Sequence, residues 1–343
     1  MLDLSRNEIP SVLKSNVQGV KNPAENKTRK ALSSGVDEKI LTLLVNAKVL
    51  TDHKEFNLAL NLLRQACNLN SKHPEVLKNL GLALENLSKW SEAKIVYSEL
   101  YRQFNNFIYA YKKAHCHYMM NEDESALTCY YEALSHLQAE ESDLFELYKN
   151  MGNIFVRRRD FDAAEESYNK AYTINAESDV LLINFGTLEV QREDFDKALF
   201  CFRKAIEVNH NNDKAWIGLA LVHNHFGDRE LAWGNLIKAL DIDAYNRTAI
   251  LLMGHWGMSE EKIKISLQYH RDFLSKNEFD EDVTLQLVHI YTQLNQLKLA
   301  ELETFKLRLW KPENENFLRL YTQIKEKTEE VKNETKETKE LAS

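Results

Sequence analysis

Two short stretches contain the residue types that could bind a metal ion. Residues 115–117 are HCH and residues 223–225 are HNH. A structural zinc site needs ligands in defined pairs, and neither stretch has partners at the spacing of a known zinc site. His117 and His223 also occupy a position in a repeating pattern, described below, where a packed ring is expected. We therefore interpret these histidines as packed or solvated side chains, and we expect no metal and no other cofactor.

The other nucleophiles and acid–base groups form no recognisable catalytic motif. The sequence has no glycine-rich phosphate loop, no HExxH motif and no serine-centred elbow, and no carboxylate pair stands out from a solvated helix face. The cysteines are scattered without a CxxC pair, which favours reduced, packed thiols and a cytoplasmic location. They are Cys67, Cys116, Cys129 and Cys201, of which the middle two are expected on opposing helices of one repeat. We predict that the chain is not an enzyme.

Small and aromatic residues recur at intervals of 34 residues, and this periodicity determines the architecture. The pattern is clearest between residues 74 and 246. One repeat has Gly152, Ala164, Tyr168 and Ala171; the next has Gly186, Ala198, Phe202 and Ala205; the third has Ala220, Ala232, Leu236 and Ala239; and an upstream repeat has Gly81, Ala93, Tyr97 and Leu100.

Each repeat contains two stretches with apolar residues at helical spacing, each of about a dozen residues. Two antiparallel helices can pack closely only if small side chains separate their backbones. Gly152 and Ala164 suit that role, and Tyr168 would fill the space beside them. Neither helix can bury its apolar face alone, so each repeat must stack on the next.

This pattern resembles the tetratricopeptide repeat, and the resemblance implies an all-α right-handed superhelical solenoid of antiparallel helical hairpins. The seventh repeat departs most from the pattern, because Ser266 occupies its alanine position and Gly254 and Gly257 lie close together. We expect eight repeats and a C-terminal capping helix. The repeats are residues 40–73, 74–106, 107–144, 145–178, 179–212, 213–246, 247–280 and 281–314, with the extra residues of the third placed in 137–144.

By the same resemblance, the first helices of successive repeats line a groove that holds an extended peptide or a partner helix. Asparagine suits such a groove because its amide both donates and accepts hydrogen bonds to a peptide backbone, and the lysines favour an acidic partner. The groove residues expected here are Asn79, Lys112, Lys149, Asn150, Asn153, Asn184 and Lys214.

Chaperone-binding members of this family clamp a C-terminal carboxylate with Lys, Asn, Asn, Lys and Arg. Lys149, Asn153, Asn184 and Lys214 match the first four positions, and Gly218 stands where the Arg should be. Arginine supplies a bidentate contact that glycine cannot make. The clamp is therefore incomplete.

Composition and charge limit the classes of partner. The chain has 343 residues, a formal net charge of -8 and 44% hydrophobic residues, which suits a helix-rich protein with a large core and argues against a general nucleic-acid binder. The basic run 157–159 falls where a helix should end, and cations are favourable there. The sequence shows neither a secretory signal nor an apolar stretch long enough to span a membrane.

The ends differ from the repeat array. Residues 1–36 are interpreted as a flexible N-terminal segment with a polar linker at 21–36; its apolar positions between residues 9 and 20 suit either a frayed tail or a docking segment. The array and its cap are expected over 37–327. Residues 328–343 are interpreted as a charged, solvated or disordered tail.

The sequence therefore predicts a cytoplasmic, non-catalytic scaffold or adaptor whose groove binds a protein or peptide partner. One alternative is a receptor for chaperone C-terminal tails. Another is a regulatory subunit of an enzyme complex, or a regulator with a small-molecule site.

Overall fold

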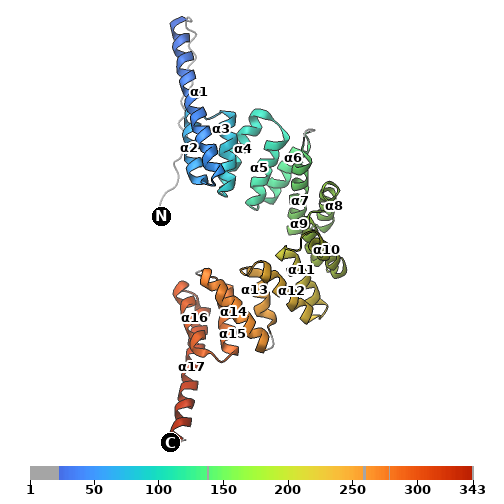
Figure 1. Cartoon of the computed structure of the whole chain (residues 1–343), viewed down its shortest axis with the longest axis vertical. Helices are drawn as coiled ribbons and strands as arrows, with labels where there is room; N and C mark the ends of the chain where they lie inside the picture. The colour runs from blue at the N-terminus through green and yellow to red at the C-terminus, as the bar shows by residue number, and fades with distance from the viewer. Residues whose placement is uncertain (1–22, 137–138, 258–259, 278, 342–343) are drawn as a thin grey trace. The chain divides into compact units, whose positions relative to one another are not determined.

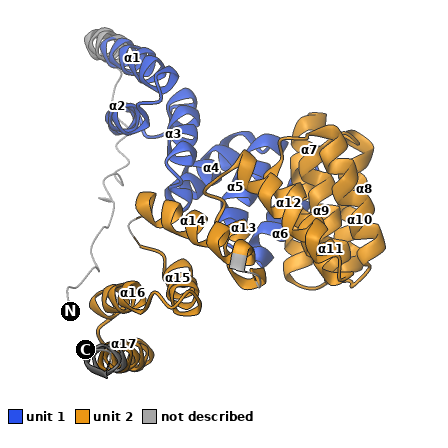
Figure 2. Cartoon of the chain, turned by 60° about the horizontal axis from the view of Figure 1, so that its bottom comes forward, with its two compact units in different colours: residues 1–139 blue, residues 140–343 orange. Residues whose placement is uncertain are grey.

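The computed structural model describes the backbone of residues 23–136, 139–257, 260–277 and 279–341. Side chains are described from residue 35 to residue 333, apart from 137–138, 258–260 and 278. Within these limits the chain folds into seventeen α-helices and no strand (Figure 1). It divides into two compact units, an N-terminal unit of residues 1–139 and a C-terminal unit of residues 140–343 (Figure 2).

Consecutive helices pair as hairpins within each unit, which confirms the predicted all-α solenoid. The N-terminal unit contains α1 (Pro23–Asp52), α2 (Phe56–Leu69), α3 (Pro74–Asn86), α4 (Trp90–Phe104), α5 (Phe107–Met119) and α6 (Asp123–Leu134). The C-terminal unit contains α7 (Glu141–Arg157), α8 (Phe161–Ile174), α9 (Asp179–Gln191), α10 (Phe195–Val208), α11 (Asp213–His225), α12 (Arg229–Ile242), α13 (Arg247–Trp256), α14 (Glu260–Lys276), α15 (Glu281–Gln293), α16 (Leu297–Trp310) and α17 (Glu315–Leu341).

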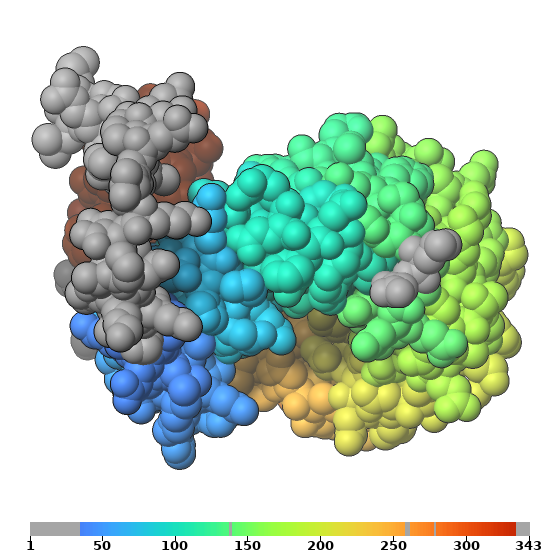
Figure 3. Space-filling view, turned by 90° about the horizontal axis from the view of Figure 1, so that it is seen from above, coloured from blue at the N-terminus to red at the C-terminus, as the bar shows by residue number. Residues whose placement is uncertain are grey.

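The small residues of the repeat allow close helix contact, as the sequence predicts. A Cβ atom added to Gly152 would lie 2.2 Å from a ring carbon of Tyr168, so only glycine leaves room for this ring. Ala164 is fully buried on the facing helix. In the space-filling view, the green-to-yellow part of the chain forms one continuous packed surface (Figure 3).

Side-chain caps fix where several of these helices begin. The side chains of Ser178, Asn246 and Asp280 accept hydrogen bonds from the backbone N–H groups of Leu181, Ala249 and Val283. Such caps satisfy backbone donors that the first turn of a helix cannot pair internally. They fix the residue at which each of these helices begins.

Two boundaries differ from the sequence prediction. Helix α1 begins at Pro23, so residues 23–36 are helical rather than a linker. Proline suits the first turn of a helix, and Gly35 is the only strong helix breaker in the stretch that follows. Helix α7 begins at Glu141, four residues before the predicted start of the fourth repeat at 145.

The C-terminal end also extends further than the predicted cap. Helix α17 runs through residues 328–341, with Phe317, Ile324 and Thr328 buried. The cap therefore packs one residue beyond its predicted end at 327, and the charged segment continues the helix. Of the described helices, none is long and apolar enough to cross a lipid bilayer.

Candidate functional site

Five of the seven predicted groove residues belong to the C-terminal unit. Lys149, Asn150 and Asn153 lie on α7, Asn184 lies on α9 and Lys214 lies on α11. These are the first helices of three successive hairpins, which is the arrangement that the sequence predicts.

Two of the asparagines meet across neighbouring repeats. The Nδ2 group of Asn184 donates a hydrogen bond to Oδ1 of Asn153 over 2.9 Å. The hydroxyl of Tyr168 donates to the same oxygen over 2.7 Å. The aromatic position of one repeat thus orients the asparagine pair. Oδ1 of Asn153 therefore accepts two hydrogen bonds within the protein. Its first role is to orient Asn184, and not to bind a ligand.

Lys149 and Asn150 are less available than the sequence suggests. The Nζ atom of Lys149 lies 2.7 Å from Glu146 Oε1, and its side chain is only 15% exposed. Asn150 is 4% exposed, so it cannot line an open groove. The sequence-based placement of Asn150 in the groove is therefore wrong, because this face of α7 is buried.

Lys214 and Asn184 line a pocket of about 360 Å³, which we call the Phe202 pocket. Lys214 is exposed and makes no ion pair with any described residue. The lining is mainly apolar, and its polar side chains include those of Asn184 and Lys214. The lining residues are Ile183, Asn184, Thr187 and Val190 from α9, Phe202 from α10, Lys214, Ile217, Gly218 and Leu221 from α11, and Asn246 and Thr248 at the start of α13.

Gly218 has a structural role that the incomplete clamp did not suggest. A Cβ atom at Gly218 would lie 2.4 Å from the Phe202 ring, and one at Gly186 would lie 2.7 Å from the same ring. The two glycines therefore hold the aromatic ring between α9 and α11. An arginine at position 218 would displace the ring and close the apolar floor. The site can hold an apolar side chain where the clamp would hold a carboxylate.

The comparisons with known proteins agree with the helical-repeat fold. A family model for the tetratricopeptide repeat matches residues 145–178, which form the hairpin of α7 and α8. Residues 145–178 are therefore a tetratricopeptide repeat, and the chain resembles tetratricopeptide-repeat proteins. No curated protein matches it in sequence.

Solved structures show a similar fold at low sequence identity. A tetratricopeptide repeat protein from Parabacteroides merdae has a TM-score of 0.59 and 18% identity, covering 73% of this chain and 98% of that one. Human IFIT1, solved as a dimer with m7Gppp-AAAA, has a TM-score of 0.58 and 15% identity, covering 79% and 67%. The Cut9–Hcn1 hetero-tetramer of the APC/C has a TM-score of 0.55 and 14% identity, covering 72% of this chain. The match covers 48% of the length of that protein, so this chain spans about half of it.

The two predicted groove residues of the N-terminal unit already have partners inside that unit, Asn79 within its own repeat and Lys112 in the preceding repeat. The Asn79 amide donates to the Glu75 carbonyl oxygen over 2.7 Å. Lys112 Nζ lies 3.0 Å from Glu85 Oε2. Both side chains therefore make contacts inside the repeat array without a ligand. Neither residue lines the Phe202 pocket.

The histidines and cysteines behave as packing groups. His117 pairs with Glu122, and His223 is buried. Burial raises the pKa of the Cys116 thiol to about 12 and that of Cys201 to about 11, so both thiols are protonated at neutral pH. Among the described residues, no group of three histidines, cysteines or carboxylates could hold a metal ion.

Sequence reasoning missed the apolar residues that form the Phe202 pocket. Ile217 and Leu221 have the helical spacing of a surface stripe, and Phe202 occupies the aromatic position of its repeat. The available signal was Gly218, because a glycine in place of the expected arginine leaves space next to the Phe202 ring.

Proposed function

We propose that this chain is a non-catalytic tetratricopeptide-repeat scaffold whose C-terminal unit binds an extended segment of a partner protein at the Phe202 pocket. An apolar side chain of the partner packs on Phe202, Ile217 and Leu221. Asn184 and Lys214 bind the partner's backbone and its acidic groups. The proposal includes a cytoplasmic location and a protein partner, and no nucleic-acid partner.

One observation supports this function best: the Phe202 pocket combines a mainly apolar lining with Lys214, which has no ion-pair partner among the described residues. Apolar surface in a pocket binds an apolar group, and a few polar groups around it orient the ligand. Lys214 has no carboxylate partner among the described residues, whereas Lys149 and Lys112 have one each. A free ammonium group attracts acidic segments, and the net charge of -8 makes the surrounding protein unfavourable for them.

A chaperone-tail receptor has less support. Its clamp needs free cations, and here Lys149 is paired with Glu146 while Gly218 replaces the arginine. The same positions instead open a floor for an apolar side chain. The proposed ligand is therefore an internal peptide segment with an apolar anchor, and not a free C-terminal carboxylate.

The experiment compares partner capture by Leu221→Asp and Leu231→Asp. Both leucines are exposed helical residues, at 38% and 56%, but only Leu221 lines the pocket. Surface changes usually alter stability by within about 0.5 kcal/mol, so both variants should fold. We expect a stoichiometric partner of the wild-type protein to be retained by Leu231→Asp and lost by Leu221→Asp. Retention by both variants would exclude the Phe202 pocket.

A further inference from the structure

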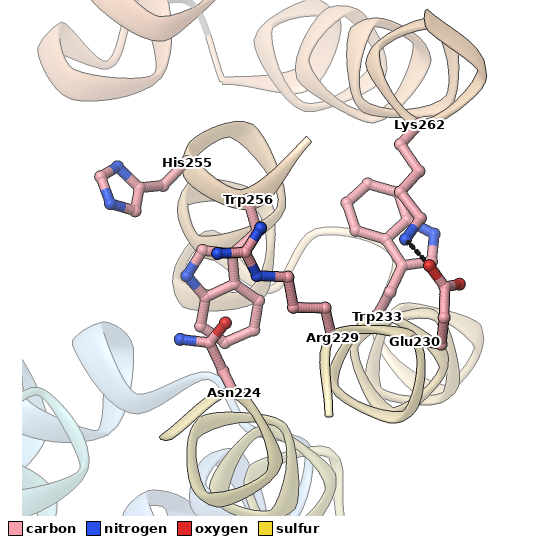
Figure 4. Close-up of a pocket in the computed structure, with 7 residues that line it drawn as sticks. All are labelled: Asn224, Arg229, Glu230, Trp233, His255, Trp256 and Lys262. Carbon is pink, nitrogen blue, oxygen red and sulfur yellow. Dashed lines mark hydrogen bonds and ion pairs between the residues drawn. The ribbon is translucent and has the colours of Figure 1, made fainter. Parts of the chain in front are cut away.

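A second pocket lies in the C-terminal unit where the sixth repeat meets the seventh. Its volume is about 400 Å³, and we call it the Trp256 pocket (Figure 4). Four helices contribute to it. The lining residues are Asn224 from α11, Arg229, Glu230 and Trp233 from α12, His255 and Trp256 from α13, and Lys262 from α14.

The short helix α13 accounts for the opening. Helices α9, α11 and α15 each have 13 residues, whereas α13 has 10 and ends at Trp256, before Gly257. Three missing residues shorten a helix by about 4.5 Å. Helix α13 therefore ends at Trp256, and this residue lines the pocket.

The two indoles of the pocket differ in how much surface they offer. Trp233 is 8% exposed, and the Nζ atom of Lys262 lies 5.4 Å from its ring centroid. Trp256 is half-buried, so more of its ring surface is open. Figure 4 shows the Arg229 guanidinium and the Asn224 amide beside the Trp256 ring, while His255 points away from them. A ligand on Trp256 would thus have a cation and an amide within reach.

The charges of the pocket leave one cation uncompensated. Lys262 Nζ lies 2.7 Å from Glu230 Oε1, so this pair contributes no net charge. Arg229 forms neither an ion pair nor a hydrogen bond through its side chain with the described residues. A guanidinium group binds carboxylates in a bidentate geometry. The site therefore favours an anion with an aromatic neighbour, and Arg229 makes it unfavourable for a cationic ligand.

The Trp256 pocket adjoins the Phe202 pocket along one helix. Leu221 lines the first pocket and Asn224 lines the second, one turn apart on α11. Three helical residues rise about 4.5 Å, which is less than the span of two extended peptide residues. One bound segment can therefore reach both pockets.

We propose that the Trp256 pocket binds an aromatic side chain and a neighbouring acidic side chain of a protein partner. The aromatic ring packs on the indole of Trp256. The carboxylate accepts hydrogen bonds from the Arg229 guanidinium and the Asn224 amide. This inference rests on the proposed function, since it takes the ligand to be a peptide, and it adds the chemistry of a second ligand position.

The test uses the full chain, in which 5-fluorotryptophan replaces the five tryptophans. Each labelled residue gives its own fluorine NMR signal, and Trp→Phe variants assign the signals. The probe is the blocked dipeptide acetyl-Phe-Asp-amide, and acetyl-Phe-Asn-amide is its neutral control. We expect the acidic dipeptide to shift the Trp256 signal saturably, with affinity about tenfold higher than that of the neutral dipeptide. Arg229→Gln should remove this difference. Arg203→Gln, a change of an exposed arginine on α10 outside the pocket, should preserve it.

Three outcomes would overturn the inference. They are an equal response to both dipeptides, an unchanged preference in Arg229→Gln, and a Trp256 shift caused by adenosine monophosphate but not by the acidic dipeptide. The last would make the pocket a nucleotide site. Each is separable from a failure of the proposed function, because the Leu221→Asp comparison reports on the Phe202 pocket alone.

Discussion

The ring of Phe202 lies against the backbone of Gly218, so closely that a Cβ atom at position 218 would come within 2.4 Å of ring atom Cε1. Such a distance is shorter than any normal contact between carbon atoms. The contact joins α10 of the fifth repeat to α11 of the sixth. It therefore contributes both to repeat stacking and to the floor of the Phe202 pocket.

A single methyl group at this position should destabilise the protein. We expect Gly218→Ala to lower the free energy of unfolding by about 1–3 kcal/mol, because the ring or the helix must move to admit it. Gly234, on α12, has no atom within 4 Å of its added Cβ, and it provides the matched control. Gly234→Ala should stabilise by about 0.4–1 kcal/mol through lower entropy of the unfolded chain. Urea unfolding of both variants measures the difference, and a Gly218→Ala variant as stable as Gly234→Ala would contradict this account.

The two lysines predicted for the groove should respond differently to charge reversal. Lys214 is unpaired among the described residues, so Lys214→Glu should weaken binding of an acidic partner by about fivefold. Lys149 is paired with Glu146, so Lys149→Glu should disturb α7 locally and change partner affinity little. Calorimetric titration with the captured partner, repeated at low and high salt, measures both effects. A larger loss of affinity for Lys149→Glu would place the ligand on α7.

Much of the fold could be predicted from the sequence, because glycine, alanine and aromatic positions are set by local packing. The 34-residue period fixes which helices meet, and Gly152 with Tyr168 shows why. The start of α1 was harder to predict. Residues 21–36 are polar, and polarity alone does not distinguish a solvated helix from a linker.

The candidate site could be predicted only in part. Asn153, Asn184 and Lys214 lie on the successive helices that the repeat implies. Which cations remain free depends on their neighbours, although the spacing of Glu146 and Lys149 already suits a helical ion pair. The Trp256 pocket depends on the early end of α13, which the repeat pattern does not specify.

The seventh repeat has a polar cluster where other repeats pack apolar groups. His270 occupies the aromatic position and is fully buried. Its Nδ1 atom lies 2.8 Å from the Ser266 carbonyl oxygen, and its Nε2 atom lies 2.9 Å from Gln286 Oε1. The Gln286 amide also donates to the Leu251 carbonyl oxygen over 3.0 Å. The junction of the seventh and eighth repeats therefore depends on buried hydrogen bonds.

This cluster should make the junction sensitive to acid. Burial lowers the pKa of His270 below its ordinary value of 6.5, although hydrogen bonds with Gln286 and Ser266 oppose the shift. The unfolded state then binds the proton more tightly than the folded state. The stability contributed by neutral His270 is fully present above pH 6.5 and is lost as the pH falls through its lower folded-state pKa. We expect the melting temperature to fall less between pH 7.5 and 5.5 in His270→Leu/Gln286→Leu than in the wild-type protein. Equal falls would contradict this prediction.

The seventh repeat should also open locally more often than its neighbours. Gly254 costs up to ~1 kcal/mol relative to alanine inside a helix, and α13 is short because it ends before Gly257. We expect lower free energies of opening by hydrogen exchange for residues 250–257 and 260–266 than for residues 182–202. Equal protection of the two regions would show that the buried hydrogen bonds compensate for the short helix.

Removal of the last three helices should destabilise the protein far more than removal of the N-terminal segment. Deletion of residues 281–343 exposes Leu267 and Leu274 of α14, which pack against the cluster that includes Leu287 and Phe317. It also removes Gln286, the partner of His270. A solenoid that loses its cap exposes the apolar face of the preceding repeat. Because α1 begins at Pro23, deletion of residues 1–22 leaves every described helix whole, unlike deletion of 1–36. Thermal melts of the 281–343 and 1–22 deletions measure the contrast, and equal losses of stability would indicate that residues 1–22 pack on the array.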